Sequence, residues 1–229
     1  MGKGTYVTGI TGFINGKDKM AAYYISLLIL LCRISSVNGN GGNSNNCRPT
    51  SHDIIGPYYV PNPPRLLQYC TGDPERHQHE RLFVHGYVYK SDCSTPMTHT
   101  RIDVWQADLS GNYTLEARCR GYLRTDSRGY YEFSTLYPGK YHLFSDANRP
   151  AHIHFKVYGK RRHKTLITQL YFAGDSSLGT NDPCTVCSSD REDLIANVEY
   201  YCEPNDHSDC IQVVRFDITL ERGRGVSQT

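Results

Sequence analysis

The chain has almost no excess charge of either sign. Its 229 residues carry 25 Lys and Arg against 23 Asp and Glu, which gives a formal net charge of +2 at pH 7. The densest basic run, Lys160–Lys164, follows a strand-like segment and Gly159, a context typical of a solvated turn. Because dedicated nucleic-acid binders concentrate basic residues on one surface, this balance excludes nucleic acid as an expected partner.

A long apolar run is also lacking. The most apolar stretch, Met20–Cys32, falls short of the roughly 20 residues that a transmembrane helix needs. It follows Lys17 and Lys19 and precedes a polar segment, as a secretory signal peptide does. We therefore expect a leader and signal peptide over residues 1–39, an Asn/Gly-rich linker over residues 40–53, and a secreted protein without membrane contact after cleavage. A membrane anchor and an ordinary buried segment are the alternatives.

Cysteine, by contrast, is plentiful. Eight cysteines follow the predicted signal peptide: Cys47, Cys70, Cys93, Cys119, Cys184, Cys187, Cys202 and Cys210. In an oxidising compartment this even set predicts up to four disulfides, whose connectivity the sequence does not fix. A zinc site is the alternative, because Cys184 and Cys187 have ligand spacing. The wider spacing of Cys202 and Cys210 fits a second pair of zinc ligands poorly.

Short alternating runs, separated by turn residues, dominate residues 54–229. Seven segments alternate in the manner of strands: 81–90, 101–108, 129–136, 140–145, 151–159, 165–172 and 211–221. Only residues 188–201 combine a capping residue with an acidic first turn, the signature of a helix. The pattern predicts one all-β domain, a β-sandwich of short antiparallel strands with long loops and one short helix.

Two histidines one residue apart lie in the strand-like segment 151–159. Residues i and i+2 of a strand point to the same side, so His152 and His154 project together, close enough to bind one metal ion. For such a pair alone, polar residues on a solvent-facing side are the alternative. A second pair of this form, His77 and His79, lies among charged residues of a long loop, and we expect it to be exposed.

The context of two tyrosines favours the metal site. The stretch "DVWQADLSGNY" ends at Tyr113, and "YPGKY" ends at Tyr141. "RPAHIHF" then places Arg149 just before the histidines, and "TLITQLYFAGD" contains Gln169. In this order, from "IIGPYYV" to "YFAGD", the chain resembles the intradiol ring-cleavage dioxygenases, such as catechol 1,2-dioxygenase and protocatechuate 3,4-dioxygenase. These are ferric enzymes that open catechols between their two hydroxyls.

The resemblance implies a non-haem Fe(III) site. Four side chains are implied as its ligands: Tyr113, Tyr141, His152 and His154. Phenolates are hard anionic donors that suit Fe(III), whereas two histidines with one carboxylate suggest Fe(II). The resemblance makes Tyr141 the ligand that substrate displaces, and gives Arg149 a role in stabilising charge on the substrate ring. The resemblance implies that Gln169 orients Arg149. It also implies that Ile54, Pro57 and Arg149 line the substrate pocket.

The expected reaction follows from the same resemblance. The substrate is a small catecholic or phenolic compound, O2 is the co-substrate, and the product is a cis,cis-muconate-type diacid. A ferric ion lowers the pKa of bound oxygen ligands, which allows catechol to bind as a dianion near neutral pH. Bacterial catechol dioxygenases dimerise through a helical N-terminal region, and nothing helical of that size precedes Ile54, so the sequence favours a monomer.

Two functions from other classes also fit parts of the sequence. A secreted β-sandwich with disulfides fits a non-catalytic binding or carrier module of the transthyretin-like kind, in which the tyrosines and histidines are aromatic surface. A zinc hydrolase fits less well, because the chain lacks the nearby acidic base of a His-Glu-x-x-His motif. For Arg149 alone, the alternative to a role at the metal site is pairing with a loop carboxylate such as Asp146. Convergence of the four donors on a point about 2 Å from each distinguishes the metal site from these alternatives.

Overall fold

The computed structural model of the chain describes residues 47–66, 70, 81–114, 118–144, 147–160, 162–203 and 206–223. The predicted signal peptide, most of the predicted linker, and His77 with His79 lie outside these residues. No helix in the described ranges is long and apolar enough to cross a membrane.

The first of two five-stranded sheets is built around β1 (Arg81–Tyr89). β4 (Tyr130–Leu136) pairs with β1 in antiparallel fashion. β11 (Asp206–Arg215) and β12 (Ile218–Thr219) pair with successive parts of β1 in parallel. β10 (Val198–Glu203) completes the sheet beside β11. The sheet is therefore mixed, whereas the sequence predicted antiparallel pairs alone.

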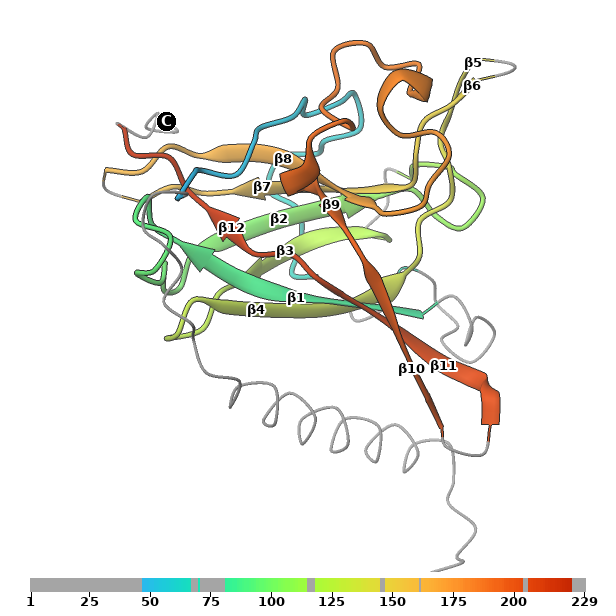
Figure 1. Cartoon of the computed structure of the whole chain (residues 1–229). Helices are drawn as coiled ribbons and strands as arrows, with labels where there is room; N and C mark the ends of the chain where they lie inside the picture. The colour runs from blue at the N-terminus through green and yellow to red at the C-terminus, as the bar shows by residue number, and fades with distance from the viewer. Residues whose placement is uncertain are drawn as a thin grey trace, which may run out of the picture. The chain divides into compact units, whose positions relative to one another are not determined.

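The second sheet contains the His-x-His segment as its central strand, β7 (His152–Val157). The strands run in the order β3 (Arg120–Arg124), β2 (Arg101–Gln106), β7, β8 (Leu166–Phe172) and β9 (Ile195–Ala196). Both neighbours of β7 are antiparallel to it. A two-stranded hairpin, β5 (His142–Phe144) with β6 (Ala147–Asn148), precedes β7 in the chain. The expected β-sandwich is confirmed, and Figure 1 shows β1 and β4 in one layer and β7 and β8 in the other.

The core lies between the two sheets. Alternation along β7 turns Ile153, Phe155 and Val157 toward the first sheet, and all three are fully buried. The Phe155 ring centroid lies 6.1 Å from that of Tyr131 on β4 and 5.3 Å from that of Phe216, which follows β11. Aromatic side chains from opposite sheets thus fill the centre of the sandwich.

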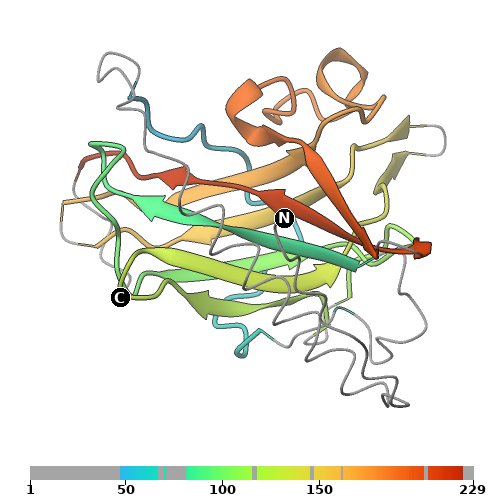
Figure 2. The same cartoon turned by 60° about the horizontal axis from the view of Figure 1, so that its bottom comes forward.

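The other face of the second sheet is covered by loops rather than by solvent. The segment 47–66, drawn in blue, crosses over β7 and β8, and the orange segment 173–194 lies above the same strands (Figures 1 and 2). Backbone bonds connect these segments to the sheet: the Asp53 N–H donates to the Ile167 carbonyl at 2.9 Å, and the Ala173 N–H to the Ala196 carbonyl at 2.9 Å. β7 is therefore buried on both faces.

The prediction of a helix over residues 188–201 is wrong. The chain forms only a 3-10 turn, η4 (Glu192–Leu194), and then enters β9 and β10; a further 3-10 turn, η3 (Gly179–Asn181), precedes it. Ile195 pairs in parallel with Tyr171 of β8, and Tyr200 pairs with Gln212 of β11. Exposed backbone at two sheet edges accepts this stretch, and that pairing outweighs the local capping signal.

Disulfides join all eight cysteines of the described chain. The pairs are Cys47–Cys93, Cys70–Cys119, Cys184–Cys187 and Cys202–Cys210. The prediction of four disulfides is confirmed, and the zinc alternative for these cysteines is wrong, since each thiol has a covalent partner. The first two bridges close loops of 46 and 49 residues in sequence separation, whereas Cys184 and Cys187 are only 3 residues apart.

Replacing the central aromatic ring should strongly destabilise the sandwich. Phe155→Ala removes a fully buried ring between two sheets, so we expect the free energy of unfolding to fall by about 3–5 kcal/mol. Tyr200→Ala is the control, because Tyr200 is 66% exposed and should change stability by at most about 0.5 kcal/mol. Denaturant titration measures both. Equal midpoints for the two variants would contradict the described packing.

Candidate metal centre

Strand register places both histidines on the covered outer face of the second sheet. Since Ile153 points into the core, His152 and His154 point the other way. His154 lies between Trp105 of β2 and Gln169 of β8 in the register, and its ring stacks on the Trp105 ring with centroids 4.7 Å apart. Each histidine is only 3% exposed. The pair is thus a buried polar feature, which the solvent-face alternative does not explain.

Tyr113 completes a compact set of three donor atoms. The Asp108 carboxylate accepts the backbone N–H of Asn112 at 2.9 Å and tightens the turn after β2 that leads to Tyr113. The Tyr113 hydroxyl lies 2.9 Å from His152 Nε2 and 3.1 Å from His154 Nε2, and the two Nε2 atoms are 3.2 Å apart. We call these three atoms the donor triad.

Burial prepares both imidazoles for a cation, and a hydrogen bond also orients His152. His152 Nδ1 lies 2.7 Å from the Pro150 carbonyl oxygen, to which only a protonated nitrogen can donate, so Nε2 presents its lone pair to the triad. Burial and then the charge of Arg149 lower the pKa of His152 to about 3. Burial, with His152 and Arg149 nearby, also lowers the pKa of His154 well below its usual range. Both rings are therefore neutral at pH 7, the form that binds metal ions.

The donor triad fits a metal ion in both geometry and chemistry. Three atoms 2.9–3.2 Å apart can all lie about 2 Å from one ion. Within the described ranges, no group of three His, Cys, Asp or Glu side chains could hold a metal. An ion bound here would therefore need the phenol as a ligand, and an anionic phenolate favours a ferric ion over zinc. The residues present fit the non-haem iron that the intradiol dioxygenases use.

Tyr141 lies beside the triad, with its hydroxyl bonded elsewhere. That hydroxyl is 2.8 Å from the Tyr58 hydroxyl, while its ring is 5.6 Å from the Tyr113 ring in an edge arrangement. Tyr58 in turn stacks on Tyr113, with centroids 4.4 Å apart and planes 7° apart. The hydrogen bond to Tyr58 and then burial raise the pKa of Tyr141. Burial likewise raises the pKa of Tyr113, so a bound cation is needed to ionise these phenols at neutral pH.

The loop that carries Ile54 and Pro57 packs directly on the triad. Gln169 donates from Nε2 to the Ile54 carbonyl at 3.0 Å. Gly56 has a φ of +70°, and a Cβ there would lie 3.3 Å from Cε1 of His154, so the turn and the close approach both favour glycine. Ile54 is half-buried and Pro57 is exposed. Both predicted pocket residues therefore lie at the edge of the site.

Side chains on both sides fix this loop in place. The buried guanidinium of Arg120 donates to the Tyr58 carbonyl at 2.7 Å and to the Thr114 carbonyl. It thereby ties the segment of Tyr58 to the segment that follows Tyr113. On the other side, the Tyr59 hydroxyl donates to the buried Asp103 carboxylate at 3.0 Å. The stacked pair of phenols is thus held by its backbone as well as by ring contact.

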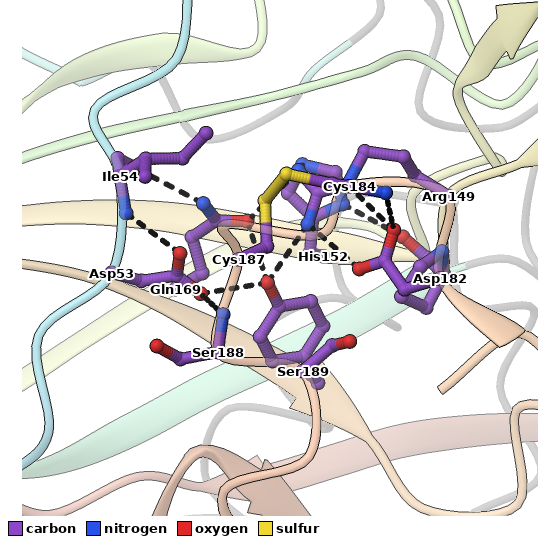
Figure 3. Close-up of polar contacts among 12 residues, drawn as sticks. Asp53, Ile54, Arg149, His152, Gln169, Asp182, Cys184, Cys187, Ser188 and Ser189 are labelled. Carbon is purple, nitrogen blue, oxygen red and sulfur yellow. Dashed lines mark hydrogen bonds and ion pairs between the residues drawn. A yellow bond between two sulfur atoms is a disulfide. The ribbon is translucent and has the colours of Figure 1, made fainter. Parts of the chain in front are cut away.

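Both oxygens of the Asp182 carboxylate hold the guanidinium of Arg149. Its Nε and Nη2 atoms donate to the two carboxylate oxygens of Asp182 at 3.2 and 3.1 Å, and Nη2 also donates to the Tyr171 hydroxyl at 2.9 Å. The remaining nitrogen, Nη1, donates to Gln169 Oε1 at 3.3 Å and lies 3.5 Å from His152 Nε2. Figure 3 shows Arg149 with Asp182 and His152 on this side of the site. One edge of the guanidinium therefore faces the donor triad.

A second carboxylate continues the network. Asp53 accepts the Tyr171 hydroxyl at 2.7 Å, the Ile54 N–H at 2.6 Å and the Ser188 N–H at 3.1 Å. The alternative partner considered for Arg149, Asp146, lies outside the described residues. Arg149, Gln169, Tyr171 and two carboxylates therefore form one continuous polar network beneath the loops.

The sequence missed four residues of this site. Tyr58 directly follows Pro57 in the segment expected to line the pocket, so its position was a usable signal. Tyr171 lies two residues after Gln169 on β8, and the alternation of a strand places both on one face. Asp53 and Asp182 come from loops, and no local pattern marked them as partners.

Burial of the neutral imidazoles should make the metal-free protein acid-sensitive. The pKa of His152 is lower in the folded state, about 3, than its usual value of 6.5. The unfolded chain therefore binds a proton that the folded chain refuses, and stability falls as the pH drops from 6.5 toward 3. We expect up to about 1.4 kcal/mol per pH unit from this group. Denaturation of metal-free wild type and His152→Gln across this range measures it, and parallel stability curves would contradict the assignment.

Comparison with known proteins places the chain in a family. Residues 54–222 match the family model described as Dioxygenase (Dioxygenase_C). The chain is 31% identical to a chlorocatechol 1,2-dioxygenase of Pseudomonas putida, over 79% of this chain and 72% of that protein. It is 29% identical to a catechol 1,2-dioxygenase of Candida albicans, over 82% and 73% of the two chains.

The crystal structure of catechol 1,2-dioxygenase from Pseudomonas arvilla C-1 has the same fold, with a TM-score of 0.65 at 23% identity, covering 90% of this chain and 69% of that one. The expected resemblance is confirmed by sequence and fold together. The chain belongs to the intradiol ring-cleavage dioxygenases, oxidoreductases that open catechol-type rings.

Proposed function

We propose that the chain is a secreted Fe(III) dioxygenase that uses O2 to cleave small catechols between the hydroxyl-bearing carbons and releases cis,cis-muconate-type diacids. The observation that carries this proposal is the donor triad, in which a buried phenol and two buried neutral imidazoles lie 2.9–3.2 Å apart. A carrier module has no need to bury two imidazoles at the cost of acid stability.

The ligands in this proposal are Tyr113, His152 and His154, joined by Tyr141. When bound, the ferric ion supplies Lewis acidity, which allows both catechol hydroxyls to ionise near neutral pH. The Tyr141 phenolate would accept one of these protons. Its hydroxyl lies 2.8 Å from that of Tyr58, so the protonated side chain keeps a hydrogen-bond partner.

Arg149 acts on charge in the substrate ring. Its Nη1 edge lies closest to the triad, 3.5 Å from His152 Nε2, and its charge is permanent. A fixed cation in a buried site stabilises negative charge that develops on the ring during attack by O2. Gln169 orients Nη1 through Oε1 and holds the Ile54 loop through Nε2.

The disulfides support the proposed secretion. Four bridges in one domain suit an oxidising compartment, because reducing conditions inside most cells keep thiols free. A secreted member of this family would meet phenolic compounds outside the cell.

Metal content and visible absorption test the proposal. The purified protein should contain iron and show a tyrosinate charge-transfer band that shifts on anaerobic addition of catechol, and O2 should then yield the diacid. Tyr113→Phe should lose the part of the band that Tyr113 contributes, while Tyr141 keeps the rest, and at least about a hundredfold in kcat, because it removes a phenolate ligand. The exposed Tyr200→Phe should match wild type. A wild-type protein that stays colourless and metal-free after iron reconstitution would favour the carrier module instead.

A further inference from the structure

The turn closed by the Cys184–Cys187 disulfide contacts both carboxylates of the Arg149 network. At its start, the Cys184 N–H donates to Asp182 Oδ1 at 2.9 Å. Just after its end, the Ser188 N–H donates to Asp53 Oδ2 at 3.1 Å. Figure 3 shows the bridge lying between these two contacts. The four-residue turn that this disulfide closes thus connects the carboxylates of Asp182 and Asp53, one at each end of the network.

Asp182 determines which edge of the guanidinium faces the donor triad. Its two oxygens accept hydrogen bonds from Nε and Nη2 of Arg149, and both side chains are buried. A paired fork fixes the plane of a guanidinium as well as its position. Only Nη1 is left to face Gln169 and His152. A rotated Asp182 carboxylate would turn the guanidinium with it and move Nη1 away from the substrate side.

Stability alone does not account for this bridge. In the chain-entropy account, a disulfide stabilises more when it closes a longer loop, and Cys184 and Cys187 are only 3 residues apart. Cys47 and Cys93, by contrast, are 46 residues apart. The turn itself projects outward, with Val186 72% exposed, so apolar packing does little to hold it. What the crosslink fixes is the pair of amides that bond the carboxylates.

We propose that Asp182 and the Cys184–Cys187 turn position Arg149 for the reaction. The disulfide holds the amide of Cys184 on Asp182 and that of Ser188 on Asp53, and the carboxylates in turn orient the guanidinium. Asp182 and the Cys184–Cys187 turn act through Arg149, so they are positioning residues. The inference rests on the proposed role of Arg149 in stabilising charge on the ring.

Two double variants separate positioning from stability. Cys184→Ser/Cys187→Ser should lower kcat for catechol about tenfold with KM within about twofold, because a misdirected charge affects the transition state more than binding. Iron content and the visible band should match wild type. The matched control Cys47→Ser/Cys93→Ser should keep the wild-type kcat yet lose more thermal stability, because it opens the longer loop. Asp182→Asn should resemble the first variant.

A metal-free measurement tests the positioning directly. In protein labelled with 15N-arginine, the Nε–H signal of Arg149 is the one that Arg149→Lys removes. Its hydrogen exchange should be slow in wild type and in Cys47→Ser/Cys93→Ser. It should be at least about tenfold faster in Asp182→Asn and in Cys184→Ser/Cys187→Ser, because the buried fork opens.

The outcomes distinguish this inference from the proposed function. A wild type that does not cleave catechol, or an Arg149→Lys variant that cleaves at the wild-type rate, would contradict the proposed function, while the exchange rates would still decide the positioning. An impaired Arg149→Lys variant beside a Cys184→Ser/Cys187→Ser variant with wild-type kcat and slow exchange would overturn the inference. So would a kcat loss in the Cys47→Ser/Cys93→Ser control as large as in the Cys184 variant.

Discussion

Burial of β7 on both faces is the constraint on which the rest of the structure depends. Its inner face is apolar and packs into the core, as in any sandwich strand. Its outer face carries His152 and His154, and a polar face of this kind can leave solvent only if other groups satisfy it. The Pro150 carbonyl, the Tyr113 hydroxyl and the loop around Gly56 provide that environment. The loops that cover the sheet thus also supply the groups that surround the two histidines.

The buried Arg149 cation is linked to two carboxylates rather than to a single partner. The buried Arg149 cation meets Asp182 in a fork, and through Tyr171 it reaches a second carboxylate, Asp53. Breaking one partner of such a buried pair costs far more than an exposed pair is worth, because a charge is left unpaired in a medium that solvates it poorly. Backbone amides of three loop residues then satisfy the remaining oxygens. The network thus joins the two covering loops to the sheet.

Much of this arrangement could be predicted from the sequence, and the reasons for success and failure are physical. Strand alternation located β7 and β8 and put His152 and His154 on one side, because a period of two residues is a local property. The helix predicted over residues 188–201 did not form. Its capping signal is local, whereas the pairing of Ile195 with β8 depends on residues that are distant in the sequence. Asp182 could not be recognised for the same reason: its partner Arg149 lies 33 residues earlier, and only the folded chain brings them together. Tyr58 directly follows Pro57 in the segment expected to line the pocket, so its place in the sequence marks it as a candidate for the site.

The single tryptophan of the chain has a consequence of its own. Trp105 is 2% exposed and its indole lies face to face with His154, 4.7 Å between centroids and 6° between planes. Light emission from this protein at tryptophan wavelengths therefore comes from one ring, in van der Waals contact with the imidazole of the candidate centre. Binding of a metal ion at the centre should therefore change the fluorescence of Trp105, which reports occupancy of the site without an added dye.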